Sequence, residues 1–225
     1  DSDQFTVELS DPTSTRQIVL NTSSDILSEK DVRIALQHAT NKQNISDGIF
    51  YGLEKPADTL FASTVPYCDI ELEPYVYDLE LAGQILDEAG WKMGSGNVRE
   101  KDGQPLNIDL LYNSDSVTEK SIAEYLQSEY QSIGVSLNIH GEEEQSYRDN
   151  MKAGNFDMVF NICWGTPYDP QSSLAAMRAP VYGDYAAQLG LDDKAEIDDA
   201  ITEILITTDE NRRQELYTYV LTHLH

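Results

Sequence analysis

Between residues 106 and 163 the chain switches repeatedly between the hydrophobic spacing of strands and that of helices. Short apolar runs, typical of buried strands, alternate with stretches in which apolar residues recur every three or four positions. The segments are 106–113 (strand), 116–133 (helix), 135–140 (strand), 143–153 (helix) and 156–163 (strand). Strands joined through helices run parallel, and helices cover both faces of such a sheet. The sequence therefore predicts an α/β fold with a mainly parallel or mixed sheet flanked by helices.

Further elements are expected on both sides of this region. They are strands at 5–10 and 17–21, and helices that start at Ser28, near Asn44 and at Asp78. Asp31 follows Ser28 by three positions, which is the spacing of a helix cap. Between 51 and 77 the sequence is rich in prolines, aromatic residues and acids, which indicates a long ordered loop, and the prolines forbid a continuous helix. Two amphipathic helices close the chain.

The charge of the chain limits its partners. Of the 225 residues 15 are basic and 40 acidic, a formal net charge of -25. The arginines are scattered, so the sequence indicates no basic face that could bind nucleic acid or an anionic membrane. Hydrophobic residues make up 40% of the chain, which is ordinary for a globular protein. No apolar run approaches the roughly 20 residues of a membrane-spanning helix.

The sequence contains no signature of an enzyme or of a bound metal. A GxSxG elbow, an HExxH pair and a P-loop are all missing, and no carboxylate pair stands out among the acidic residues. We therefore expect no catalytic residues, and no metal ligand is assigned. The spacing of His38, His140 and the two terminal histidines favours packing and surface roles. Cys68 and Cys163 cannot form a CxxC metal site, and a single disulfide between them stays open.

The segment after the last predicted strand is the most distinctive one. It reads Cys-Trp-Gly-Thr-Pro-Tyr-Asp-Pro from Cys163. In a parallel sheet, ligands bind beyond the carboxyl ends of the strands. Trp164 and Tyr168, held there by two prolines, would offer a rigid surface for stacking and hydrogen bonding. The alternative is that both aromatic residues simply cover the edge of the sheet.

Several stretches of the chain, at consistent spacing, resemble one family of binding proteins. They are 50–61 with 65–67, 78–91, the glycine and three glutamates at 141–144, 164–170, 177–180 and 187–191. Together they resemble the solute-binding proteins of nickel ABC importers, within the dipeptide- and oligopeptide-binding family. The resemblance covers nearly the whole chain.

The resemblance implies a periplasmic-binding-protein type II architecture, in which two lobes trap the ligand between them. The chain looks like the second lobe alone, one α/β unit over 1–225, excised from a two-lobed monomer. Its implied ligand is nickel in complex with a small organic chelator, as cargo and not as a cofactor. The implied partners are the ABC permease and ATPase, and the implied location is periplasmic or extracellular, with a lipoprotein anchor as one possible full-length form.

Carried over residue by residue, the resemblance names five candidate ligand-binding residues. Trp164 and Tyr168 would pack on the chelate. The family's tyrosine after the triple glutamate is replaced by Arg148, with Tyr147 one place earlier. Tyr182 stands where the nickel proteins often carry a histidine that can bind metal, and arginines from the missing first lobe would grip the chelator. A peptide receptor is the alternative function, and an enzyme a distant third.

Overall fold

The computed structural model describes residues 8, 12, 14–163, 170–180 and 182–225. Its elements in chain order are β1 (Thr15–Leu20), α1 (Lys30–His38), α2 (Lys42–Ile49), α3 (Leu79–Glu88), β2 (Lys92–Met93), β3 (Arg99–Lys101), β4 (Gln104–Pro105), β5 (Asn107–Asn113), α4 (Val117–Ser132), β6 (Ser136–Glu142), α5 (Glu144–Ala153), β7 (Met158–Cys163), α6 (Gln171–Ala176), α7 (Gly183–Ala187), α8 (Lys194–Ile206) and α9 (Glu210–Leu224). The strand predicted at 5–10 falls, apart from Glu8, outside the described residues.

Four strands form the main sheet in the order β1-β7-β5-β6. β5 runs parallel to both of its neighbours, with Asn107 of β5 opposite Ser136 of β6. β1 runs antiparallel to β7 along its whole length and places Thr15 opposite Cys163. The predicted βαβ arrangement is confirmed, and β1 makes the sheet mixed.

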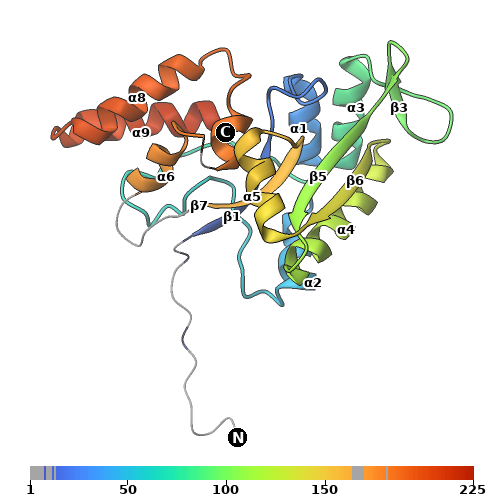
Figure 1. Cartoon of the computed structure of the whole chain (residues 1–225), viewed down its shortest axis with the longest axis horizontal. Helices are drawn as coiled ribbons and strands as arrows, with labels where there is room; N and C mark the ends of the chain where they lie inside the picture. Colours follow the sequence, from blue (N-terminus) through green and yellow to red (C-terminus); the bar gives the residue numbers. More distant parts are fainter. Residues whose placement is uncertain (1–7, 9–11, 13, 164–169, 181) are drawn as a thin grey trace, which may run out of the picture.

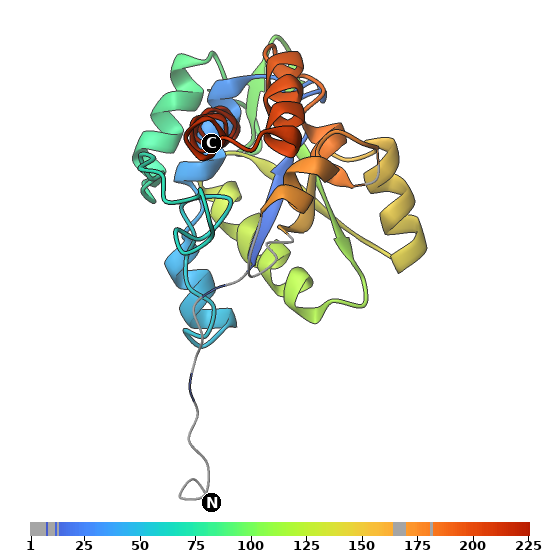
Figure 2. The same ribbon diagram turned by 90° about the vertical axis from the view of Figure 1, so that its left-hand side faces the viewer.

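Helices cover both faces of the main sheet. Figure 2 shows α5, in yellow, on one side of the strands, and α1 and α3, in blue and green, on the other. In Figure 1, α8 and α9 lie together beyond the β1 end of the sheet. Each face therefore has an apolar layer of its own.

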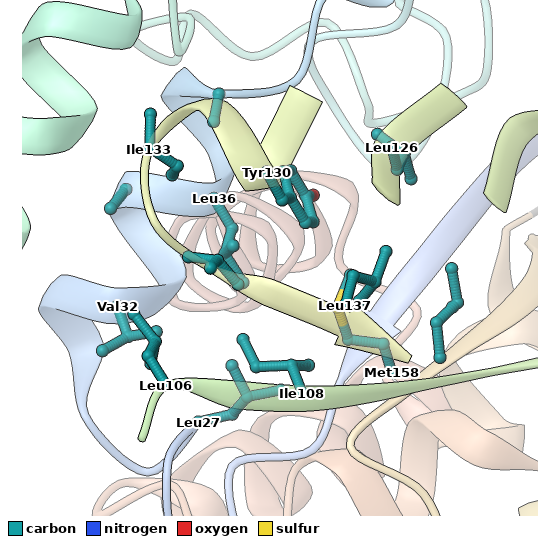
Figure 3. Close-up of a cluster of buried hydrophobic side chains, with 14 of the residues drawn as sticks. Leu27, Val32, Leu36, Leu106, Ile108, Leu126, Tyr130, Ile133, Leu137 and Met158 are labelled. Carbon is teal, nitrogen blue, oxygen red and sulfur yellow. The ribbon is translucent and has the colours of Figure 1, made fainter. Parts of the chain in front are cut away.

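The larger apolar layer lies between the sheet and the helices α1, α3 and α4. Figure 3 shows how strand and helix side chains meet there: Ile108 of β5, Leu137 of β6 and Met158 of β7 lie near Leu36 of α1 and Leu126 of α4. The opposite face is covered by α5 and α7, which pack on Leu111 and Val159. Burial on both faces explains why the apolar run of β7, which starts with the buried Met158, Val159 and Phe160, is nearly continuous.

A separate apolar cluster joins α8 and α9 to the loop between 51 and 77. The loop has no helix or strand, as predicted, and inserts Phe61 and Val65 into this cluster. The two cysteines that the sequence left open as a pair, Cys68 and Cys163, are both buried in it. The Cys68 thiol donates a hydrogen bond to the Pro66 carbonyl at 3.4 Å.

The cap predicted for the first helix is wrong. α1 begins at Lys30 with Glu29 in the cap position, and no side chain caps it. The Ser28 hydroxyl instead donates to the Asp25 carbonyl at 3.0 Å, because residues 24–28 form a turn of their own. The carboxylate of Glu29 is held by Lys101, whose Nζ lies 2.7 Å away.

Arg99 anchors the small sheet β2-β3-β4 against the main domain. Its guanidinium donates to the Ile133 and Trp91 carbonyl oxygens, both at 2.7 Å, and to the Asp87 carboxylate at 2.9 Å. The side chain is only 7% exposed. Arg99 therefore joins α3, β3 and the end of α4 through one buried group.

Candidate functional site

The carboxyl ends of three parallel strands meet at one edge of the main sheet. β5 ends there at Asn113, β6 at Glu142 and β7 at Cys163, and α4 and α5 begin just beyond the first two strands. The antiparallel β1 starts at this edge with Thr15. We call this place the carboxyl edge, and it is where open α/β sheets bind ligands.

The predicted ligand residues Trp164 and Tyr168 follow directly on Cys163 in the sequence. Both lie outside the described residues, so their placement in a binding site stays a prediction. The residues that surround the end of β7 at Cys163 are described.

Asn113 draws two carboxylates together at the carboxyl edge. Its backbone N–H donates to Glu119 Oε2 at 2.9 Å, and its side-chain amide donates to Glu144 Oε2 at 2.5 Å. Ser116, the first residue of the helix predicted over 116–133, caps α4 by accepting from the Glu119 N–H at 3.2 Å. The Glu119 side chain, however, turns to the strand end. Burial raises the pKa of the Glu119 carboxyl, and the Asn113 N–H and nearby Arg16 counteract that rise.

Tyr147 and Arg148, adjacent on α5, have different environments. Tyr147 is 7% exposed and its hydroxyl donates to the Phe160 carbonyl of β7 at 2.5 Å; burial raises its pKa. The side chain of Arg148 is 63% exposed and donates to Glu144. The geometry favours a structural role for Tyr147, whereas Arg148 is accessible at the carboxyl edge.

Arg16 connects the carboxyl edge to the segment after α2. It lies on β1 opposite Ile162 and forms two hydrogen bonds with the Glu54 carboxylate, at 3.1 and 3.3 Å. Its guanidinium also lies 5.4 Å from the centre of the Phe50 ring. The stretch 50–61, singled out in the sequence, is thus attached to β1 at this edge.

Tyr182 is half-buried and immediately precedes α7. The backbone at the next residue, Gly183, lies close to the sheet: a Cβ there would be 3.0 Å from Val159 and 3.3 Å from Val19. Asp184 then accepts hydrogen bonds from Gln17 of β1, at 2.9 Å, and from the amide of Asn161 on β7. Tyr182 is therefore attached to two strands of the sheet through the residues that follow it.

The far end of α7 is locked to the loop after β1. Thr22 donates to the Ala187 carbonyl through its N–H at 2.8 Å and through its hydroxyl at 2.5 Å. The Gly190 N–H donates back to the Thr22 hydroxyl at 3.0 Å. Ala187 and Gly190 belong to the stretch 187–191 noted in the sequence, and their bonds to Thr22 hold the end of α7 in place.

The buried Lys194 holds the same segment from α8. Its ammonium group donates to the Met177 carbonyl at 3.1 Å, the Gln188 side chain at 3.2 Å and the Asp198 carboxylate at 2.6 Å. Three donors thus meet three acceptors, as burial of a lysine requires. The segment around Tyr182 is fixed from β1, β7 and α8.

Burial raises the pKa of the Asp184 carboxyl to about 6, and hydrogen bonds from its own N–H, Gln17 and Asn161 oppose this shift. A carboxyl whose pKa is higher in the folded state binds its proton more tightly there. Its contribution to stability is therefore complete below the unfolded pKa near 3.9 and is lost as the pH rises through about 6.

We expect this dependence to vanish in Asp184→Asn, which has no charge at any pH. The free energy of unfolding of the wild type, minus that of the variant, should be larger near pH 4.5 than near pH 7.5. Urea denaturation of both proteins at both pH values measures this difference. Burial also raises the pKa of Asp157 and Glu119, but both proteins contain these carboxyls, so their contributions cancel in the difference. A difference that does not change with pH contradicts the expectation.

Among the described residues, no group of three or more histidine, cysteine, aspartate and glutamate side chains could hold a metal ion. The histidines have other partners in the structure. His38 and His225 interact with backbone carbonyl oxygens, each at 2.7 Å, and His140 lies 3.2 Å from the Asp109 carboxylate. A hollow of about 440 Å³ lined by Asp25, Asp109 and Asp157 lies near the opposite edge of the sheet.

Sequence reasoning missed Asp184 and its two amide partners. One signal was present: Asn161 is a polar residue inside the apolar run of β7. An amide that is half-buried in a sheet favours a hydrogen-bond partner, but the sequence could not say that the partner is 23 positions away.

The chain matches known proteins along most of its length. The model of the bacterial extracellular solute-binding proteins, family 5, middle part, matches residues 1–184. The nickel-binding periplasmic protein of Escherichia coli K12 is 43% identical over 222 residues, and the dipeptide-binding protein of the same organism is 25% identical over 205 residues. These alignments cover 98% and 91% of the chain, but 42% and 37% of the relatives.

A solved structure repeats the match in three dimensions. The crystal structure of NikA from Brucella suis in complex with Fe(III)-EDTA superposes with a TM-score of 0.93 at 47% identity. It covers 97% of this chain and 44% of NikA. The mixed sheet and its flanking helices are thus those of the type II periplasmic binding proteins, and the chain spans about two fifths of the length of these relatives.

Proposed function

The chain belongs to the bacterial extracellular solute-binding proteins of family 5, and we propose that it forms one lobe of a receptor that captures nickel as a small-molecule chelate. One observation carries this proposal: identity to a nickel-binding periplasmic protein is 43%, against 25% to a dipeptide-binding protein. The peptide receptor predicted as the alternative remains the competing function. Members of this family are solute-binding proteins, and we propose no catalytic role.

We propose that the carboxyl edge faces a second lobe across the ligand. Because the chain covers 42% of its nickel-binding relative, a further part of the protein would supply the opposite wall. Trp164 and Tyr168 would pack on the chelate, and the exposed Arg148 would face its polar groups. Tyr182 would donate a hydrogen bond at the rim. A clamp of two lobes can bury most of a small ligand, which one open edge cannot do.

In this proposal the nickel ion arrives with its coordination supplied by the chelator. A neutral imidazole is a good ligand for divalent nickel, whereas a tyrosine hydroxyl is protonated near neutral pH and is a poor one. Tyr182 occupies the position where the resemblance expects a histidine. The lobe would thus recognise the complex by its shape and polar groups.

The partners follow from the same proposal. The receptor would be a periplasmic or extracellular monomer that delivers its cargo to an ABC permease and its ATPase, with lipoprotein anchoring as one form of the full-length protein. Among the described residues, no helix combines the length and apolar character that a membrane crossing requires.

Titration calorimetry on the complete two-lobed protein tests the function. We expect weak binding of nickel alone and much tighter binding of nickel with free histidine or another small chelator. Trp164→Ala and Tyr168→Ala should each weaken binding by about tenfold, the order expected for an aromatic stacking contact. Tyr77→Ala is the matched control, because Tyr77 contacts Glu129 near the far end of α4, at the opposite edge of the sheet.

Two results would contradict the proposal. One is a peptide that co-purifies with the complete protein, identified by mass spectrometry, together with no response to nickel and chelator. The other is tight binding of bare nickel that Tyr182→Phe abolishes, since a direct bond from the protein to the metal would then exist.

A further inference from the structure

A single carboxylate joins three elements at the carboxyl edge. Asp184, in the first turn of α7, accepts from the Gln17 amide of β1 through Oδ1 at 2.9 Å. Its other oxygen, Oδ2, accepts from the Asn161 amide of β7. Both partners are neutral amides, so the group acts as a double acceptor rather than as half of an ion pair.

The orientation of one amide is fixed from its other side. Asn161 Oδ1 accepts a hydrogen bond from the Ile162 N–H at 2.9 Å. The Asn161 nitrogen must therefore face Asp184, and the residue at 184 has to offer an oxygen in that place. Gln17 carries no such constraint in these contacts, so its amide can turn and present either its nitrogen or its oxygen.

The bonded residues adjoin both candidate ligand segments. Asn161 precedes Trp164 by three positions, with Cys163 as the last residue of β7 between them. Asp184 follows Tyr182 by two positions, and Gly183 between them packs against Val19 and Val159. One carboxylate thus sets the distance between the end of β7 and the start of α7.

The rest of α7 has independent attachments. Its far end is held by Thr22 through Ala187 and Gly190, and the following segment is held by Lys194. Loss of the Asp184 bonds should therefore release the start of α7 locally while the lobe stays folded.

We propose that Asp184 is a positioning residue for ligand capture, which holds the start of α7, and with it Tyr182, against the paired strands β1 and β7. The proposal rests on the proposed function for its ligand. It requires acceptor oxygens at residue 184 and does not require their negative charge. Asparagine can satisfy it, because its oxygen can face Asn161 while its nitrogen donates to a turned Gln17 amide.

Three variants test the proposal: Asp184→Ala, Asp184→Asn and the control Asp149→Ala. The control removes a carboxylate that accepts from the side-chain amide of Gln145 at 3.0 Å, but within one helix, α5. The first readout is the backbone amide NMR spectrum of this chain. The second is the affinity of the complete protein for nickel with free histidine.

We expect Asp184→Ala to shift the amide signals of Tyr182 and Gly183 and to weaken chelate binding by about ten- to a hundredfold, the range found when a residue that orients a ligand-contacting group is removed. Asp184→Asn should leave these amide signals in place and keep the affinity within about threefold of the wild type. The control Asp149→Ala should do the same. A melting curve for each variant shows that the lobe remains folded.

Unchanged amide signals and affinity in Asp184→Ala would overturn the proposal. Equal losses in Asp184→Asn and Asp184→Ala would overturn it too, because charge and not acceptor geometry would then be responsible. If the complete wild-type protein binds no nickel chelate, the proposed function fails, while the amide signals still decide whether Asp184 positions the start of α7.

Discussion

Replacing Gly190 with alanine should destabilise the chain by about 3 kcal/mol or more, which corresponds to a fall in melting temperature of roughly 6–12 °C for a chain of this size. A Cβ at Gly190 would lie 2.1 Å from the carbonyl oxygen of Thr22 and 2.9 Å from the Ser23 nitrogen. Both atoms belong to the backbone, so no side-chain rotation relieves the contact. The loop after β1 and the end of α7 would have to separate, which breaks the hydrogen bonds between Thr22 and Ala187.

Gly48→Ala is the matched control for this substitution. Gly48 lies exposed on α2, and a Cβ there would meet no atom within 4 Å. Alanine in a helix costs less backbone entropy than glycine, so this variant should be neutral or more stable by up to about 1 kcal/mol. Urea denaturation of the two variants gives the comparison. A Gly190→Ala variant as stable as Gly48→Ala would show that the two backbone segments are not locked together.

The second large loss of stability is expected for Arg99→Ala, at about 2–5 kcal/mol, since an interior acceptor that loses its donor costs about 1–3 kcal/mol. The substitution leaves the Ile133 and Trp91 carbonyl oxygens without the guanidinium that now donates to them in the interior. It also removes the main reason that the pKa of Asp87 lies below its ordinary value, which is the hydrogen bond from Arg99. The Asp87 pKa should therefore rise in the variant, which NMR titration can follow.

A comparison of Arg212→Ala with Arg99→Ala shows whether the loss of stability depends on the burial of the arginine or on the number of its hydrogen bonds. Arg212 donates to both oxygens of Glu203, at 2.7 and 2.8 Å, and to Glu215 at 3.3 Å, and these bonds raise its pKa. Its side chain is 46% exposed, against 7% for Arg99. Water screens the pair and replaces its hydrogen bonds, so the loss should be much smaller than for Arg99→Ala. Equal losses would contradict this assignment of roles.

The sequence predicted the α/β core because hydrophobic spacing and stop signals agree there. Helix α4 has its cap at Ser116 and ends before Gly134, whose φ of 82° suits glycine. The predicted start of α1 is wrong because Ser28 and Asp31 have the spacing of a helix cap, although the helix begins at Lys30. The sequence could not show that Glu29, in the cap position, binds Lys101. Neither the short sheet β2-β3-β4 nor the brief helix α7 has enough residues to show a period.

The candidate site was harder to predict, since its contacts join distant parts of the chain. Arg148 was identified through the family motif, and it is exposed at the carboxyl edge. Tyr147 was named by the same motif, but its hydroxyl bonds the Phe160 carbonyl in the interior. Asp184 stayed hidden among 40 acidic residues, because only the fold brings it to Gln17 and Asn161.

The pairing of β1 with β7 has a consequence for biosynthesis. β1, at Thr15–Leu20, leaves the ribosome long before β7 at Met158–Cys163, which is the one strand that pairs with it among the described residues. The nascent chain must therefore carry β1 as an unpaired strand while the rest of the lobe is made, and then close a long loop, which slows folding. Its opening residues, Thr15, Arg16 and Gln17, are polar or charged. Such residues discourage the unpaired strand from associating with neighbouring chains before β7 has been synthesised.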